Sequence, residues 1–243
     1  MSRFLDQDFE KLVLYVNEYK LSDALSSKAR ITQIKRGHKY CLSALQAWSI
    51  MEQKGKAGIL QISNISIDAK ELSFDLLSEC FSDIVSSFSA ALHGLYKPAN
   101  MSLRSSIETF TKGISSLHST EASTTKSVYR IFEIAKTCNT FSDASEKYFN
   151  TVHQQYVLLC NFTHTSTKAH MVRNHALANF TKQDNEQLKV WVAHYEATIK
   201  AILSILMLAN SRIYLDTPPK AQDIYEETVP KEIRLHALGM STM

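Results

Sequence analysis

Glycine and proline are scarce in this chain, with 6 and 4 copies in 243 residues. The two residue types usually make up about 12% of a sequence, and sheet proteins need them in their tight turns. Their scarcity argues against a sheet-rich fold and favours long helices. Charged residues make up 21% of the chain and hydrophobic residues 44%, which is typical of a folded globular protein and argues against disorder.

Motifs that pair cysteines are also absent. The four cysteines, Cys41, Cys80, Cys138 and Cys160, lie far apart and form no C-x-x-C pair or zinc-finger spacing. We expect reduced thiols, most of them buried, because an unpaired cysteine packs as a small hydrophobic residue. The first residues, MSRFLDQDFEKL, carry acids where a signal peptide needs an apolar run. The longest apolar stretch, 201–209, is less than half of the about 20 residues that span a membrane, so we expect a cytoplasmic protein without membrane contact.

The common catalytic and nucleotide-binding motifs are missing as well. The chain has no G-x-x-x-x-G-K-[ST], no G-x-G-x-x-G, no G-x-S-x-G and no zinc-deaminase pattern. His164, His170 and His175 are spaced by six and five residues, whereas helical zinc sites use histidines about four residues apart. We therefore predict neither a metal nor a cofactor.

What the chain does contain is a succession of apolar residues at helical spacing. Helices are predicted over residues 4–20, 23–52, 67–93, 98–117, 126–138, 142–163 and 184–213. Ser22 and Asp184 are expected as N-caps, and Pro98 as the first residue of its helix, where its missing N–H is not needed. An extended loop is expected over 54–66, a turn over 119–125, and partial helix over 165–181.

These helices predict an all-α fold, a single helical bundle of about seven to eight helices. We predict one domain over residues 1–215, because no internal repeat and no linker divides it. Residues 216–243 are polar, and we expect either a loosely docked helix or an arm that reaches a partner.

The net charge of +3 is ordinary, but acids are missing from two stretches. Residues 24–51 carry His38 and five cations, which are Lys28, Arg30, Lys35, Arg36 and Lys39. Residues 147–183 carry four cations and four histidines, which are Lys147, Lys168, Arg173, Lys182, His153, His164, His170 and His175. Two interpretations stay open: a surface that faces a phosphate backbone, or basic residues that cluster by chance on solvated helix faces.

The stretch LRSSIETFTKGI, residues 103–114, places Arg104 and Glu108 four residues apart beside an apolar stripe. On the surface, such a pair stabilises a helix by about 0.3–0.5 kcal/mol at most, and here the base comes first, which is the weaker order. A half-buried guanidinium would instead need carboxylate or phosphate oxygens for its donors. Arg104 is therefore predicted to be either a structural brace or a site residue.

The end of the helix predicted over 142–163 is the second candidate region. Asn161 and His164 lie three residues apart, next to residues that are expected to be buried. An imidazole at a helix terminus is suited to titrate near neutral pH. The alternative is a histidine with no role beyond the surface or the core.

Taken together, these residues resemble a known family. A helix that reads G-x-Y-x-x-A-x-x-x-x-R-x-x-x-E, followed about fifty residues later by Y-x-x-L-x-x-x-x-H, resembles a branch of the bacterial HEPN-like helical bundles. The positions are Gly94, Tyr96, Ala99, Arg104, Glu108, Tyr156, Leu159 and His164. The resemblance implies a four-helix core over about residues 70–210 with additions. It also implies a homodimer and a role as a ribonuclease of bacterial toxin–antitoxin, antiviral defence or RNA-processing systems.

The chain departs from the family hallmark, which is R-x(4–6)-H within one helix. The nearest spacing, Arg30 to His38, has seven intervening residues, so a composite site from two helices is expected instead. In that hypothesis His164 moves the proton of the RNA 2′-hydroxyl or of the leaving oxygen, Arg104 stabilises the phosphorane charge, and Glu108 positions Arg104. The expected substrate-binding residues are Asn161, Thr165, Lys168, His170 and Arg173. The function is then that of an RNA-binding protein or a metal-independent endoribonuclease, with RNA as its partner.

The alternative is a non-catalytic interaction module: a dimerising scaffold, a sensor, or the neutralising partner protein of a defence or toxin–antitoxin effector. In that case Arg104 and Glu108 brace two helices, and His164 closes a helix end. The two acid-free stretches discriminate between the hypotheses. If both stretches share one face with Arg104 and His164, RNA binding is favoured. If they lie on different faces, the interaction module is favoured.

Overall fold

The computed structural model describes residues 3–18, 21–55, 66–164 and 183–240, and within these ranges it is all-helical, as predicted. The expected loop over 54–66 and the stretch 165–181 lie almost entirely outside the described residues. The α-helices are α1 (Arg3–Glu18), α2 (Lys28–Lys54), α3 (Ile67–Leu92), α4 (Tyr96–Ser116), α5 (Thr120–Thr124), α6 (Val128–Ala135), α7 (Glu146–His164), α8 (Asn185–Ala209), α9 (Arg212–Leu215), α10 (Pro219–Thr228) and α11 (Lys231–Ala237).

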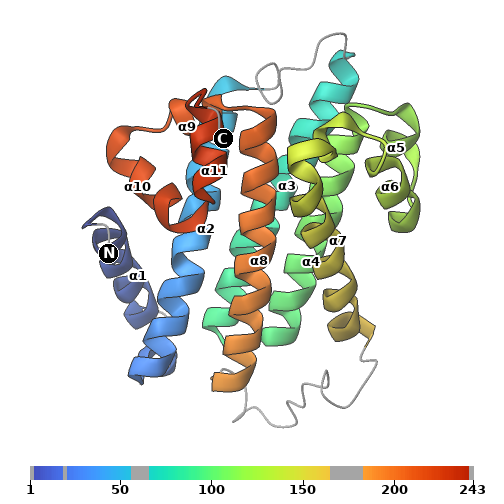
Figure 1. The fold of residues 1–243 in the computed structure, drawn as a ribbon. Helices are drawn as coiled ribbons and strands as arrows, with labels where there is room; N and C mark the ends of the chain where they lie inside the picture. The colour runs from blue at the N-terminus through green and yellow to red at the C-terminus, as the bar shows by residue number, and fades with distance from the viewer. Residues whose placement is uncertain (1–2, 19–20, 56–65, 165–182, 241–243) are drawn as a thin grey trace.

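Helix α8 is the central element of the bundle. It packs against α2 on one side and against α4 and α7 on the other, while α3 and α4 form an extensive antiparallel pair beside it (Figure 1). Two of its aromatic side chains, Trp191 and Tyr195, are at most 1% exposed. By length and composition α8 is also the one helix in the described residues that could cross a membrane. Since 61% of its most apolar window is buried inside the fold, the core accounts for this apolar character.

Two buried hydrogen bonds join α8 to α3, and a third joins α3 to α4. Trp191 Nε1 donates to Ser87 Oγ at 3.1 Å, and Ser87 Oγ donates to the carbonyl of Ala99 at 2.7 Å. Tyr195 donates from its hydroxyl to the carbonyl of Ile84 at 3.0 Å. Because each polar tip of these aromatic residues has a partner, their large rings can be buried without an unsatisfied donor.

A glycine lets α2 approach this aromatic layer. A Cβ atom at Gly37 would lie 3.2 Å from the Trp191 ring and 3.3 Å from the Phe88 ring. Such contacts are tighter than ordinary van der Waals packing, so any larger residue at this position would push α2 away from α3 and α8.

Several helix boundaries differ from the prediction. Helix α2 begins after Ser27, whose side chain accepts from the backbone N–H of Arg30, so Ser22 is not its N-cap. Ser22 instead opens the 3-10 turn η1 (Ser22–Leu25), which interrupts the helix predicted from residue 23. Helix α4 begins at Tyr96, so Pro98 is its third residue; this position is still in the first turn, where no N–H partner is lost.

Other boundaries divide the second half of the chain more finely than predicted. The residues expected as a turn over 119–125 form the short helix α5. The 3-10 turns η2 (Asn139–Phe141) and η3 (Asp143–Ser145) precede α7. Asp184 caps α8, as predicted, with Oδ1 accepting from the N–H groups of Glu186 and Gln187. Helix α8 ends at Ala209 rather than 213, because the chain turns extended at Asn210 before α9.

The chain after residue 215 folds onto the bundle. Helix α10 packs against α2 and α1, and α11 packs against α8. Ile224 and Tyr225 are fully buried, and Ile233 is 2% exposed. The sequence predicts either a loosely docked helix or an arm for residues 216–243. The described residues of this segment instead form helices that end at Ala237 and pack against the bundle through buried side chains.

The side chain of Gln183, just before α8, caps the C-terminus of α3. Its Nε2 donates to the carbonyls of Ala91 at 3.2 Å and Leu92 at 2.7 Å, and its Oε1 accepts from the Tyr96 hydroxyl at 2.5 Å. The amide is buried, so one side chain satisfies two carbonyls at a helix C-terminus and one phenol at the start of α4.

We expect the substitution Gln183→Ala to lower the free energy of unfolding by about 2 kcal/mol, because it removes the buried hydrogen bonds of the Gln183 amide to the Leu92 carbonyl and the Tyr96 phenol. Urea denaturation followed by circular dichroism measures this change. The control is Gln53→Ala at an exposed position of α2, where we expect a change below about 0.5 kcal/mol. Equal effects of the two substitutions would contradict the role of Gln183.

Candidate functional site

Arg104 and Glu108 form the predicted pair on α4. Arg104 Nη2 lies 2.6 Å from Glu108 Oε1, and the two side chains are 22% and 25% exposed. The pair is therefore half-buried. Burial alone would lower the pKa of Arg104, but Glu108, Tyr156 and Cys160 together outweigh burial and raise the pKa, so the guanidinium stays charged.

The guanidinium faces α7 as well as Glu108. Its Cζ atom lies 5.5 Å from the centroid of the Tyr156 ring, a cation–π distance. Burial raises the pKa of Tyr156 to about 12, with further contributions from Cys160 and Glu108. Arg104 therefore links α4 to α7 through an ion pair on its own helix and an aromatic contact on the next.

Unpaired polar atoms gather around this link. Among the described residues, Arg104 Nε and Asn100 Oδ1 are buried and have no hydrogen-bond partner. Asn100 lies one turn before Arg104 on α4 and is 2% exposed. On α3, Asp83 Oδ2 is also buried without a partner. We use "polar seam" for these three residues together with Glu108, Tyr156 and Cys160.

Asp83 is the carboxyl of the polar seam with the most unfavourable surroundings. Burial raises its pKa above the usual 3.8, and the nearby charges of Glu79 and Glu108 raise it further, whereas a hydrogen bond with Ser105 lowers it. The polar seam therefore contains two carboxyl groups, of Asp83 and Glu108, and one guanidinium. The negative charge of these carboxyls attracts Arg104 and stabilises its position.

The predicted His164 is the last residue of α7. It follows Cys160 by four residues and Tyr156 by eight, so the three residues lie along one side of α7. Tyr156 and Cys160 belong to the polar seam, and His164 ends the helix one turn beyond Cys160. The side chain of His164 lies outside the described part of the structure.

The remaining predicted site residues are partly outside the description. Asn161 is half-buried in the last turn of α7. Thr165, Lys168, His170 and Arg173 lie outside the described residues. The structure therefore brings Arg104 and Glu108 together and leaves the expected substrate-binding set after residue 164 untested.

The cations of the first acid-free stretch belong to α2, on the opposite side of α8 from α7 (Figure 1). Most of them are engaged by other elements: Arg30 by Asn185 and the Gln183 carbonyl, Lys35 by Asp6, Arg36 by Glu196, His38 by Asp8, and Lys39 by Glu227. Acids from α1, α8 and α10 thus lie beside three of the five cations and beside His38.

The described part of the second stretch is engaged in a similar way. Lys147 Nζ lies 3.1 Å from Glu232 Oε1 of α11. The His153 ring packs 4.7 Å from the Phe132 ring of α6, measured between centroids, and burial lowers the pKa of this histidine below 6.5. Within the described residues, the acid-free stretches and Arg104 therefore do not share one face.

Metal ligands do not gather at the polar seam. Throughout the described ranges, no group of three or more His, Cys, Asp or Glu side chains is placed to hold a metal ion. Cys41, Cys80 and Cys138 are buried free thiols, as predicted, and Cys160 is partly exposed.

Sequence reasoning found Arg104, Glu108 and Tyr156 but missed three members of the polar seam. Asn100 is four residues before Arg104, so its place on the same helix face could have been predicted. Asp83 and Cys160 reach the seam through the packing of α3 and α7, for which the sequence carries no local signal.

Comparison with known proteins finds no matching family model, curated protein or solved structure for this chain. The HEPN-like resemblance stays a prediction.

The pKa of Asp83 leads to a pH-dependent prediction. Its pKa is higher in the folded than in the unfolded chain, so ionisation opposes folding at pH values above the unfolded value of 3.8. We expect Asp83→Asn to raise the free energy of unfolding at pH 7 and to lose this advantage as the pH falls below 3.8.

Urea denaturation between pH 3 and 8 measures this dependence. Asp75→Asn, at an exposed position of the same helix, removes an equal charge and is the control. A similar gain from both substitutions would mean that net charge, and not the surroundings of Asp83, causes the effect.

Proposed function

We propose that this protein is a non-catalytic helical interaction module that acts as a cytoplasmic homodimer. The observation that carries the proposal is the placement of the α2 cations, which lie on the opposite side of α8 from α7 and the polar seam. A composite RNA site would need these cations on the face that carries Arg104, because phosphate contacts along a bound strand must lie beside the reacting groups.

Arg104 fits the same proposal as a brace. Its guanidinium joins Glu108 on α4 to the Tyr156 ring on α7, and its Nε atom is buried. A guanidinium held between a carboxylate and an aromatic ring, and partly removed from solvent, is less accessible to a substrate phosphate than an exposed one. The likeness of these residues to the HEPN-like bundles supports a place beside an effector of a bacterial defence or toxin–antitoxin system, as its neutralising or sensing partner.

The second candidate is a metal-independent endoribonuclease with a composite site. It is favoured by the placement of Tyr156, Cys160 and His164 at one-turn intervals on α7, the first of them in contact with Arg104. In this scheme His164 moves the proton of the 2′-hydroxyl, and Arg104 stabilises the charge on the phosphorane oxygens.

Cleavage of total RNA and a tRNA pool in the presence of a chelator separates the two candidates. We expect the wild-type protein to release no cleavage products under conditions in which a metal-independent ribonuclease, the positive control, cleaves both RNA samples. Cleavage that disappears in both Arg104→Ala and His164→Ala would overturn the module and establish the composite site.

The brace also makes a prediction for stability. We expect Arg104→Ala to lower the free energy of unfolding by about 1 kcal/mol, because it leaves the half-buried Glu108 unpaired. Arg130→Ala is the matched control, since Arg130 forms a similar pair with Glu121 at a fully exposed site. Thermal and urea denaturation should show a smaller loss for the control; equal losses would count against a brace.

We expect the dimer interface on the outer face of α7, and substitutions on this face test it. Val157 and Leu158 are adjacent there and are 52% and 38% exposed, beside the residues that contact α4. Neighbouring exposed apolar side chains are typical of interaction surfaces. We expect the wild-type protein to sediment at twice 27.5 kDa and the double substitution Val157→Lys, Leu158→Lys to sediment at 27.5 kDa.

The control for this measurement is Leu45→Lys on α2, which is 42% exposed and lies on another side of the bundle. It should leave the dimer intact. A wild-type protein that sediments at 27.5 kDa would refute the dimer while leaving the brace untouched.

A further inference from the structure

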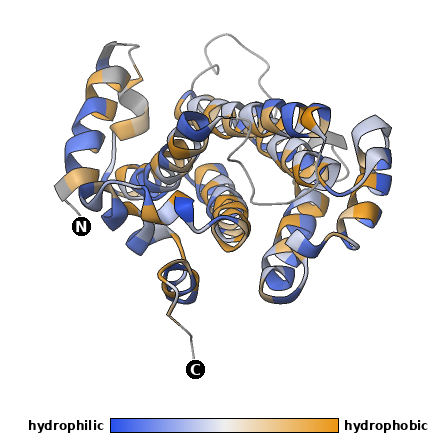
Figure 2. Ribbon diagram, turned by 90° about the horizontal axis from the view of Figure 1, so that it is seen from above, coloured by the Kyte–Doolittle hydropathy of each residue, from blue (hydrophilic) through white to orange (hydrophobic). Residues whose placement is uncertain are grey.

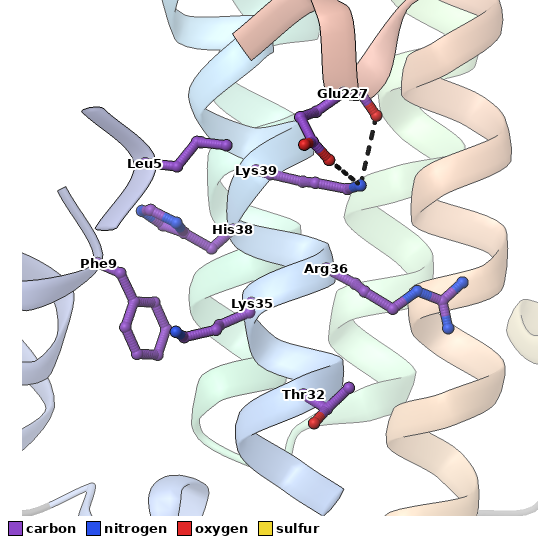
Figure 3. A pocket seen from close by; sticks show the side chains of 8 residues that line it. All are labelled: Leu5, Phe9, Thr32, Lys35, Arg36, His38, Lys39 and Glu227. Carbon is purple, nitrogen blue, oxygen red and sulfur yellow. Dashed lines mark hydrogen bonds and ion pairs between the residues drawn. The ribbon is translucent and has the colours of Figure 1, made fainter. Parts of the chain in front are cut away.

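A pocket of about 200 Å³ lies between α1, α2 and α10, away from the polar seam. Figure 3 shows α2 as its floor, with Leu5 and Phe9 of α1 on one side and Glu227 of α10 above. Figure 2 shows α1 at the outer edge of the bundle. The pocket therefore lies between an outer helix, α1, and a helix of the central bundle, α2.

The α1 side of the pocket has apolar side chains, and Lys35 of α2 reaches this side, with Nζ 4.7 Å from the centroid of the Phe9 ring. Leu5 is 3% exposed, and the Phe9 ring packs edge-on against the His38 ring with centroids 5.7 Å apart. His38 is itself buried and is hydrogen-bonded through Nε2 to Asp8 Oδ2 at 2.9 Å. Burial lowers the pKa of His38 below 6.5 despite this carboxylate and so favours the neutral ring.

Three cations of α2 also line the pocket, and they differ in how close their acid partners lie. Arg36 is bound by Glu196 at 2.6 Å. Lys35 donates no hydrogen bond within the described residues, and its nearest carboxylate oxygen, Asp6 Oδ1, is 3.9 Å away. Lys39 Nζ has only long contacts to Glu227, at 3.3 Å to the carbonyl and 3.5 Å to Oε2. Two ammonium groups thus retain hydrogen-bonding capacity at the pocket.

These features match a ligand with an apolar body and one negative charge. We infer that the pocket binds a small amphipathic monocarboxylate, whose apolar group lies against Leu5 and Phe9. Its carboxylate draws in the flexible side chains of Lys35 and Lys39, which here point in different directions, toward Phe9 and toward Glu227 (Figure 3). The volume is below the roughly 300–1,000 Å³ of pockets for drug-sized ligands, so the ligand is small. A dianion fits less well, because Glu227 lines the pocket and Asp6 and Asp8 lie beside it.

This inference does not depend on the proposed function, since the pocket shares no residue with the polar seam. The occupied pocket would join α1 to α2 and α10 more firmly. Helix α1 is otherwise attached mainly through these two helices and η1, so ligand binding should be visible in its backbone.

The test is isothermal titration calorimetry of the full chain at pH 7 with octanoate, compared with octan-1-ol as a neutral probe of similar shape. We expect octanoate to bind and octanol to bind at least tenfold more weakly. Lys35→Gln and Lys39→Gln should each weaken octanoate binding about tenfold, after circular dichroism has verified that the variants are folded.

The matched control is Lys28→Gln, which removes the same charge from an exposed position at the start of α2, outside the pocket. It should change the affinity less than twofold. Hydrogen exchange gives an independent readout: octanoate should slow exchange in residues 3–18 and leave residues 128–135 of α6 unchanged.

The inference is overturned if octanoate does not bind, if octanol binds equally well, or if Lys28→Gln weakens binding as much as Lys35→Gln does. Slower exchange in α6 without a change in α1 would likewise place the ligand elsewhere. None of these outcomes bears on RNA cleavage or on the dimer, so the two proposals stand or fall separately.

Discussion

The contact of α8 with α3 is the interaction on which the rest of the bundle depends. Trp191 and Tyr195 fill the centre, and both rings are anchored to α3, one through Ser87 and one through the Ile84 carbonyl. Ser87 passes the link on to α4 through the Ala99 carbonyl. On the far side of the same rings, Gly37 allows α2 to pack closely. Helices α2, α3, α4 and α8 are thus held around one aromatic layer, and the other helices attach to this core.

Charge in this protein is distributed between helices and not along them. Helix α2 has no acid from Lys28 to Met51, yet its cations meet acids from three other helices that are distant in sequence. The polar seam has the opposite composition, with several carboxyls around one guanidinium. Because the cations of α2 meet acids of other helices, ionic contacts favour one arrangement of α2 relative to α1, α8 and α10. Reading charge along one stretch alone overstates how basic the folded surface is.

The sequence predicted the helices well wherever apolar residues repeat at helical spacing over many turns, as in α2, α3 and α8. The Arg104–Glu108 pair was also predictable, because both residues lie on one helix four positions apart. Boundaries were harder: Ser22 and Ser27 are both good caps, and the choice between them depends on packing around η1. The burial of Tyr225, the acids that meet α2, and the place of Asp83 in the polar seam all arise from contacts between distant segments. Periodicity and spacing carry no information about those contacts.

The position of α8 along the chain has a consequence for how the protein is made. The aromatic layer cannot form until Trp191 and Tyr195 have been synthesised, although α2, α3 and α4 precede them by many residues. At about 5–20 residues per second, the ribosome takes roughly 10–35 s to pass from the start of α2 to the end of α8. During that interval the apolar sides of α2 and α3 have no α8 to cover them. The nascent chain is then a natural client for chaperones that bind exposed hydrophobic helices, and a translational pause before α8 would lengthen this exposure.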